Sequence, residues 1–184
     1  MTTAVRPGKT GLLVALLVGC AVAVGLGVYG NVHDPTGRSL VSLFFSATIN
    51  AKVWLATAAM ALGLFQLGSA LRIYGKIGTG PAPSWLGSAH RISGTLAFVF
   101  TLPVSYHCLW ALGFTGDAGT RILVHSLVGC FFYGAFAAKV LIVRNRSVPG
   151  WALPWAGGAV FTGLVVLWLT SSFWFFTSVE FPGF

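Results

Sequence analysis

Long apolar stretches are the feature that most restricts how this chain can fold. They follow one another along the sequence, and each holds about 20 mostly apolar residues, the length that an α-helix needs to cross the hydrocarbon core of a bilayer. Only 8% of the 184 residues are charged, against about 25% in a typical soluble domain. Helices are the spanning structure that satisfies its own backbone hydrogen bonds within one segment. The sequence therefore predicts a single all-α domain over residues 1–184, an integral membrane bundle of five transmembrane helices with no room for a soluble catalytic domain.

Turn-forming residues and basic loops divide the apolar stretches and give the expected helix bounds. The five transmembrane helices are expected at about residues 11–30, 51–73, 88–113, 121–143 and 151–176. Basic residues before the first stretch also suit a cleaved secretory signal. The apolar run continues beyond Cys20, however, so we expect a membrane helix there.

The distribution of basic residues predicts the orientation in the membrane. With the N-terminus inside, the inner segments hold eight of the 11 Lys and Arg residues, namely Arg6, Lys9, Arg72, Lys76, Arg91, Lys139, Arg144 and Arg146. The outer segments hold Arg38, Lys52, Arg121 and the three acidic residues. Cytoplasmic segments carry the excess of Lys and Arg. We expect a multi-pass protein of the bacterial plasma (inner) membrane, with its N-terminus inside and its C-terminus outside.

The net charge of +8 does not indicate a nucleic-acid partner. Nucleic-acid binding needs a basic face or stripe, whereas these residues are scattered at helix ends, where the lipid bilayer is the expected partner. The three cysteines fall in apolar runs, and no CxxCH motif occurs. Neither a disulfide framework nor covalent haem attachment is therefore expected.

Two histidines in neighbouring helices point to a cofactor. An ionisable residue within a membrane span is costly and indicates function. His107 lies about two turns before the end of the third helix, and His125 lies just over one turn after the start of the fourth. A short connection makes the two helices antiparallel neighbours, so both imidazoles are expected at similar depth near the outer face. This pattern is typical of one haem b per chain, with one histidine on each side of the iron.

The residues around these histidines suit a haem. Gly129 follows His125 by one turn, where a larger side chain would press on a porphyrin. Arg121 precedes His125 by one turn, and Arg38 lies in the outer loop. Either guanidinium could pair with the haem propionates. The alternatives are that His107 and His125 form interhelical hydrogen bonds, or that they belong to a metal site, for which zinc would need three or four ligands.

A second polar group lies at the opposite end of the third helix. It contains Ser88, His90, Arg91 and Ser93, with Arg72 and Lys139 expected nearby. Such a group could bind a quinone headgroup or an anionic lipid headgroup, or simply anchor the helix start at the interface. His90 precedes His107 by 17 residues, about 25 Å along a helix. It would therefore ligate a second haem only by pairing with its copy in a homodimer. His33 is either solvated or a lid over the haem edge.

The sequence His-Arg-Ile-Ser-Gly at residues 90–94 resembles the His-Arg-x-Ser-Gly motif of the succinate dehydrogenase cytochrome b subunit. In that family the serine and the arginine help to form a quinone site, which implies such a role for Arg91 and, at a shorter spacing, for Ser88. The paired histidines are similar to those of ascorbate-reducible and ferric-reductase-type transmembrane cytochromes b. The segments 101–113 and 121–144 also resemble small bacterial integral membrane proteins.

These observations favour an electron-transfer component over a self-contained enzyme. We expect a membrane b-type cytochrome that passes electrons between an outer-face partner and quinone or a partner subunit. One alternative is a cofactor-free anchor or accessory subunit, whose glycines (Gly19, Gly25, Gly27, Gly63 and Gly68 among them) would allow close helix contacts. Another is a small transporter, although no helix core holds the carboxylate that coupled transport usually needs.

Overall fold

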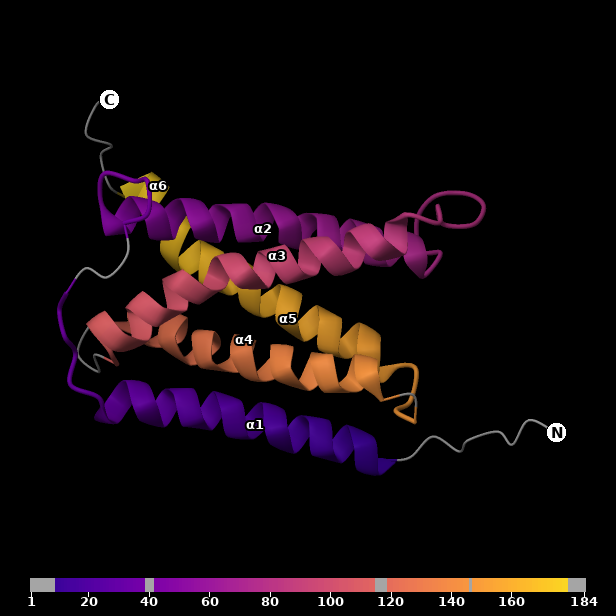
Figure 1. The fold of residues 1–184 in the computed structure, drawn as a ribbon, viewed down its shortest axis with the longest axis horizontal. Coiled ribbons are helices and arrows are strands. Elements are labelled where there is room, and N and C mark those ends of the chain that lie inside the picture. Colours follow the sequence, from indigo (N-terminus) through magenta and orange to yellow (C-terminus); the bar gives the residue numbers. More distant parts are fainter. Residues whose placement is uncertain (1–8, 39–41, 115–118, 146, 179–184) are drawn as a thin grey trace. The chain divides into compact units, whose positions relative to one another are not determined.

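A computed structural model describes residues 9–38, 42–114, 119–145 and 147–178. Five helices in this part of the chain are long and apolar enough to cross a membrane, and no strand occurs among the described residues (Figure 1). They are α1 (Lys9–Val32), α2 (Thr48–Ile73), α3 (Leu86–Tyr106, extended by π-helical His107–Leu112), α4 (Thr120–Arg144) and α5 (Ala152–Trp168, extended by π-helical Leu169–Phe173 and α6, Trp174–Ser178). The prediction of five membrane-spanning helices is confirmed, and each helix starts and ends within three residues of its expected bound.

The two π-helical segments were not expected from the sequence. The first continues α3 from His107 to Leu112, and the second continues α5 from Leu169 to Phe173.

Of the charges that predict the orientation, four lie outside the described residues, namely Arg6, Asp117, Arg146 and Glu180.

The outward faces of the helices are apolar. In α1, Leu17 is 60% exposed and Val24 is 64% exposed, although both are aliphatic. Soluble proteins rarely expose large continuous apolar surface. These faces suit contact with the acyl chains of a lipid bilayer, as a multi-pass membrane protein requires.

The chain forms two compact units. The first comprises Met1–Asp34 and Gly113–Leu167, and the second comprises Pro35–Leu112 and Trp168–Phe184. The boundaries fall after α1, between α3 and α4, and near the end of α5. Each unit therefore contains helices that are distant in the sequence.

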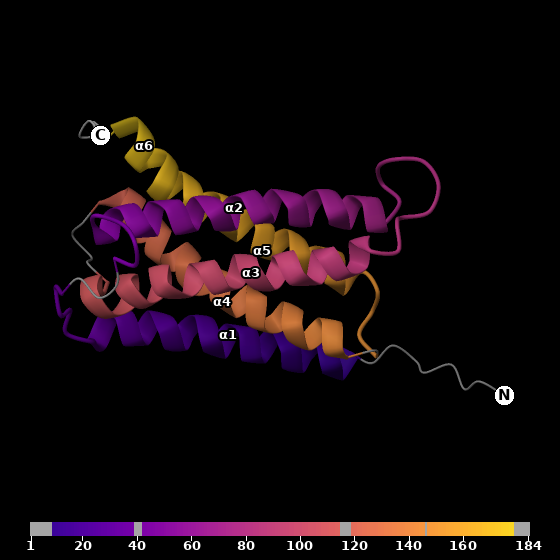
Figure 2. The same cartoon turned by 45° about the horizontal axis from the view of Figure 1, so that its top comes forward.

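In the first unit, α1 packs along α4, and the two helices run side by side in both views (Figures 1 and 2). A Cβ atom added to Gly19 would lie 2.7 Å from the carbonyl oxygen of Gly134 and 2.9 Å from Cβ of Ala138. A Cβ atom on Gly134 would likewise collide with the carbonyl oxygen of Gly19. Small residues let helix backbones approach closely where lipid supplies no hydrophobic driving force. Gly19 therefore serves the packing of α1 on α4 within the same chain.

Helix α5 joins this pair at one end and along α4. Ala15 of α1, Ile142 of α4 and Ala152 of α5 are buried against one another. Farther along, a Cβ atom added to Gly163 would lie 3.5 Å from Cβ of Phe132. The first unit is therefore a three-helix body with α4 between its two neighbours.

In the second unit, α2 packs against α3, and the C-terminal part of the α5 region contacts α2. The Ser172 hydroxyl, which is completely buried, donates to the carbonyl of Val53 at 3.1 Å. Nε1 of Trp168 donates to the Thr57 hydroxyl at 3.1 Å. Ser172 lies in the π-helical segment Leu169–Phe173, and Trp168 directly precedes it. Hydrogen bonds therefore hold this segment on α2.

We expect Gly134→Leu to destabilise the protein by about 1–3 kcal/mol, because overpacking of a close contact forces backbone shifts. Gly25→Leu is the matched control, since a Cβ atom at Gly25 meets nothing within 4 Å. Reversible unfolding in mixed detergent micelles measures both free energies. Equal losses in the two variants would show that the contact between Gly19 and Gly134 does not hold α1 to α4.

Candidate functional site

His107 is a buried imidazole with unused hydrogen-bonding capacity. Its side chain is 9% exposed, and its Nδ1 atom has no hydrogen-bond partner in the part of the chain that the structure describes. A buried polar atom without a partner costs about 1–3 kcal/mol. The residue also begins the π-helical segment of α3, and single π turns within helices occur frequently at functional sites. His107 is therefore the strongest candidate for a ligand-binding residue in the second unit.

The loop that follows α1 is fastened to the same helix end. The amides of Thr36 and Gly37 donate to the carbonyls of Trp110 and Ala111 at 3.3 and 3.0 Å. These carbonyls are among the last of the helix, which find no partner within it. Gly37 has φ +61°, a conformation that glycine adopts without strain. Arg38 follows Gly37 directly. The structure therefore brings Arg38 to the π-helical end of α3, which comprises His107–Leu112.

Lys52 is a residue near His107 that the sequence analysis did not select. It lies in the first turns of α2, close enough to His107 for its charge to act on the ring. The described residues of the second unit contain no Asp or Glu. Within them, no carboxylate neutralises Lys52 or Arg38. The signal that could have identified Lys52 is its place as a charge just inside an apolar helix on the predicted outer side.

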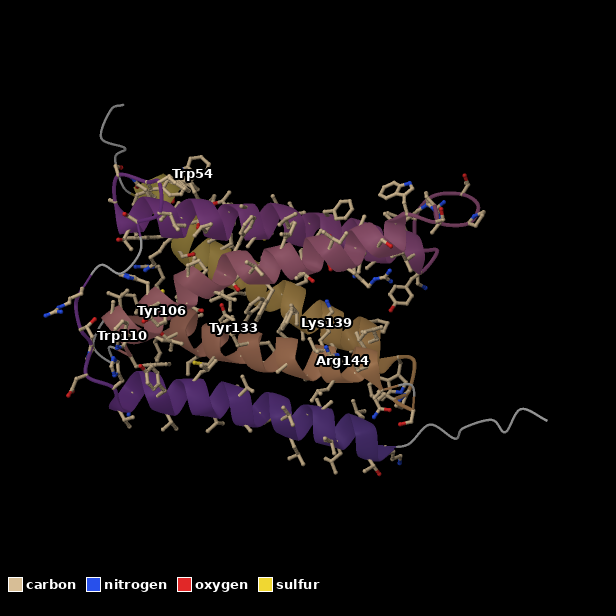
Figure 3. The ribbon with its side chains drawn as sticks, in the orientation of Figure 1. Trp54, Tyr106, Trp110, Tyr133, Lys139 and Arg144 are labelled. Atoms are coloured by element: carbon tan, nitrogen blue, oxygen red, sulfur yellow. The ribbon has the colours of Figure 1, made fainter. Side chains whose placement is uncertain are left out.

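Aromatic side chains lie beside the π-helical segment. The rings of Tyr106 and Trp110 have centroids 5.3 Å apart at an angle of 41°, and Figure 3 shows both at this end of α3. Tyr106 is 49% exposed. The pair fits the aromatic belt that forms where membrane meets water.

His125 lies in the first unit, in the second turn of α4, and is half-buried. Both His125 and Arg121, one turn earlier, interact with other groups of the protein. Gly129 follows His125 by one turn, and a Cβ atom there would lie 3.8 Å from Cδ2 of Leu167. The Gly129–Phe132 face of α4 therefore packs on α5. The pairing of His125 with His107 stays a prediction.

The polar group at the start of α3 divides into two sets. His90 and Ser93 join α2, because Nδ1 of His90 lies 2.7 Å from the Ser69 hydroxyl and Nε2 of Gln66 donates to the Ser93 hydroxyl at 2.7 Å. Gln66 also donates to the carbonyl of His90. This interhelical cluster consists of Gln66, Ser69, His90 and Ser93.

The other two residues form an exposed pair. Arg91 Nη2 donates to the Ser88 hydroxyl at 3.2 Å, and both side chains are exposed. Gln66 and Ser69 were missed by the sequence analysis. Their spacing of three residues on one face of an otherwise apolar helix is the signal that could have found them.

Arg72 binds the backbone of the connection that follows α2. Its guanidinium donates to the carbonyls of Thr79, Gly80 and Pro81 at 2.9, 3.0 and 2.9 Å. It thereby holds the connection between α2 and α3. Lys139, which was expected near the same group, belongs to α4 of the first unit.

His33 lies just beyond α1, and its ring stacks on Tyr29 with centroids 5.0 Å apart. The residue is half-buried against this partner. Among the described residues, no group of three or more His, Cys, Asp and Glu side chains could hold a metal ion. A zinc site of the usual three or four ligands therefore has no candidate in that part of the chain.

We expect Gln66→Met to destabilise the protein by about 1 kcal/mol, because interhelical hydrogen bonds in membranes contribute amounts of this order. Leu67→Met is the matched control at an adjacent, 40% exposed position. Thermal unfolding in one detergent compares the two variants with the wild type. An unchanged midpoint for Gln66→Met would show that the cluster does not hold α2 to α3.

Comparison with known proteins adds a family relationship. No curated protein and no solved structure matches the chain. The model of a family described as "Family of unknown function (DUF6529)" matches residues 12–183. This range contains nearly all of the five helices. The chain therefore belongs to the DUF6529 family.

Proposed function

We propose that the protein is a b-type cytochrome of the bacterial plasma membrane, with its N-terminus inside and its C-terminus outside. It carries one haem b near the outer face, ligated by His107 and His125. It transfers electrons between an outer-face redox partner and quinone or a partner subunit. The observation that carries this proposal is the buried His107 imidazole, whose Nδ1 atom lacks a partner in the described part of the chain.

The environment of His107 fits a residue that would hold a haem better than it fits a structural histidine. A structural histidine in a membrane span would use its ring nitrogens in interhelical hydrogen bonds. His90 does this through Ser69, whereas His107 leaves Nδ1 unused. An imidazole held by a helix and not fully engaged by protein groups is available to a bound group. The residues present therefore fit a haem ligand at this position.

The choice of His125 as the second ligand rests on matched positions along the two helices. His107 precedes the end of its helical segment, Leu112, by five residues, and His125 follows the start of α4, Thr120, by five residues. Five residues correspond to about 7.5 Å along a helix. Both imidazoles would thus lie at similar depth below the outer interface.

Three cations would bind the propionates. Arg38, Lys52 and Arg121 lie toward the same predicted side of the membrane, and a guanidinium matches the geometry of a carboxylate. The positive charge of Lys52 acts on the His107 ring. When bound, the haem supplies one-electron chemistry, while the protein sets its position and potential.

The opposite end of α3 offers donors for a quinone carbonyl. Arg91 and Ser88 are exposed there and bond to each other, beside the cluster that contains His90 and Ser93. The resemblance of residues 90–94 to the succinate dehydrogenase motif supports this assignment. An anionic lipid headgroup is the competing ligand for these donors. In a homodimer, His90 would meet its copy, which is the one arrangement in which it would ligate a second haem.

A cofactor-free accessory subunit is the second candidate. Gly25 and Gly68 favour it, because a Cβ atom at either residue meets nothing within 4 Å. Such glycines let a partner helix approach closely. In that case the protein would be colourless and would co-purify with a larger complex.

The direct test is a visible spectrum of the detergent-purified protein, oxidised and then reduced with dithionite, after expression with haem available. We expect sharp bands of six-coordinate reduced haem b in the wild type. His107→Ala and His125→Ala should lose the haem or convert it to a high-spin form. His90→Gln is the control and should keep the wild-type spectrum. A folded but colourless wild type would contradict the cytochrome assignment and leave the accessory subunit.

Neutralising the cations near His107 should lower the midpoint potential of the haem. Positive charge stabilises the reduced form, which carries one electron more, so Arg38→Gln and Lys52→Gln should each shift the potential by about tens of millivolts. Lys76→Gln removes an exposed charge in the connection after α2 and serves as the control. Redox titration measures the shifts. Equal midpoint potentials in the wild type and the three variants would place the haem away from Arg38 and Lys52.

A further inference from the structure

The first unit gathers three helix ends at one place. The start of α1, the end of α4 and the start of α5 meet there, held by the contact among Ala15, Ile142 and Ala152. A Cβ atom added to Gly11 would contact the side chain of Asn145, which continues the close packing of α1 and α4 to their ends. Cations placed at this end therefore belong to one body.

Three cations among the described residues lie at this end. Lys9 begins α1 and Arg144 ends α4, whereas Lys139 lies five residues before Arg144. Five residues place Lys139 about 7.5 Å inside the helix end, and its side chain is half-buried. Figure 3 shows Lys139 and Arg144 on the end of α4 near its connection to α5. A lysine inside a membrane span calls for a partner or a path to the interface.

No carboxylate among the described residues balances the charge at this end. Asp34 is the only acidic residue among all the described residues. It follows the far end of α1, whose 24 residues correspond to about 36 Å. Within the described part of the chain, the cations at this end therefore have no acidic partner.

Open space lies on the neighbouring helix. Lys139 follows Phe132 by seven residues and so shares its face of α4, and Phe132 contacts Gly163 of α5. Because α4 and α5 are antiparallel, a step of seven residues forward on α4, from Phe132 to Lys139, matches a step of seven residues back on α5, from Gly163 to Ala156. Lys139 therefore lies level with Ala156. Next in sequence, Gly157 and Gly158 have nothing within 4 Å of an added Cβ atom.

Tryptophans mark the depth of this end. Trp151 is 60% exposed and Trp155 is 75% exposed, at the start of α5. Exposed tryptophans are enriched at the level of the lipid headgroups. The cations thus lie at the depth where phosphates of a bilayer are found.

We infer that the cations at this end of the first unit bind the headgroup of an anionic phospholipid. Lys139 and Arg144 contact its phosphate, Lys9 lies at the rim, and an acyl chain passes beside Gly157 and Gly158. Basic groups between membrane helices are known to bind anionic headgroups on the cytoplasmic side. This site uses residues of the first unit alone, and the inference does not depend on the proposed haem or quinone.

The test measures binding of phosphatidylglycerol and phosphatidylcholine to the purified full-length protein in neutral detergent by native mass spectrometry. We expect phosphatidylglycerol to bind the wild type more tightly than phosphatidylcholine. The double variant K139Q/R144Q should bind phosphatidylglycerol about thirtyfold more weakly, since each basic residue near the surface contributes about 1 kcal/mol and 1.4 kcal/mol is tenfold. Its affinity for phosphatidylcholine should not change.

Lys76→Gln is the matched control, because it removes one exposed charge from the second unit and should leave both affinities within about twofold of wild type. If K139Q/R144Q does not fold, R144Q alone should lose about fivefold, and K139R should retain binding. Equal losses in K76Q and R144Q would overturn the inference, because they would indicate diffuse attraction only. Displacement of the lipid by millimolar inorganic phosphate would also overturn it, by showing a site for the free ion.

Discussion

The absence of water in the hydrocarbon core of the membrane is the constraint on which the rest of this structure depends. Every backbone donor and acceptor at that depth must find a partner within the protein. The same demand falls on polar side chains, and several of the described residues meet it by bonding across helices. Ser172 reaches the carbonyl of Val53, and Gln66 reaches Ser93. Against this background, the Nδ1 atom of His107 is an exception, because it has no hydrogen-bond partner among the described residues.

Close packing fulfils a second requirement, because lipid chains are as apolar as the helix surfaces that they cover. Gly19 and Gly134 bring the backbones of α1 and α4 into contact, and hydrogen bonds join α2 to α3. The two units thus use different means of holding helices together. The glycine contact suits a rigid apolar body, whereas the polar cluster places hydrogen-bonding groups near a membrane face.

The helices could be predicted from the sequence because their length and apolar content are set by the thickness of the bilayer. The candidate site could be predicted only in part. His107 was found as an ionisable residue within a span, but the π-helical turn that begins there leaves no mark on the apolar pattern. Lys52 and Gln66 were missed because their roles depend on which helices pack together, and a single sequence does not show helix pairing. Arg72 was assigned to a polar group, whereas its three bonds to loop carbonyls reflect a loop fold that the sequence pattern does not specify.

The proposed ligation of one haem iron by His107 and His125 can be examined by pulsed electron paramagnetic resonance of the frozen ferric protein. Selective ¹⁵N labelling of histidine gives each coordinated imidazole a hyperfine signature. We expect a low-spin signal with two histidine nitrogens in the wild type and one fewer coordinated histidine in a His107→Ala or His125→Ala variant that retains haem. A low-spin signal with two histidine nitrogens that persists in either variant would rule out this pair of ligands.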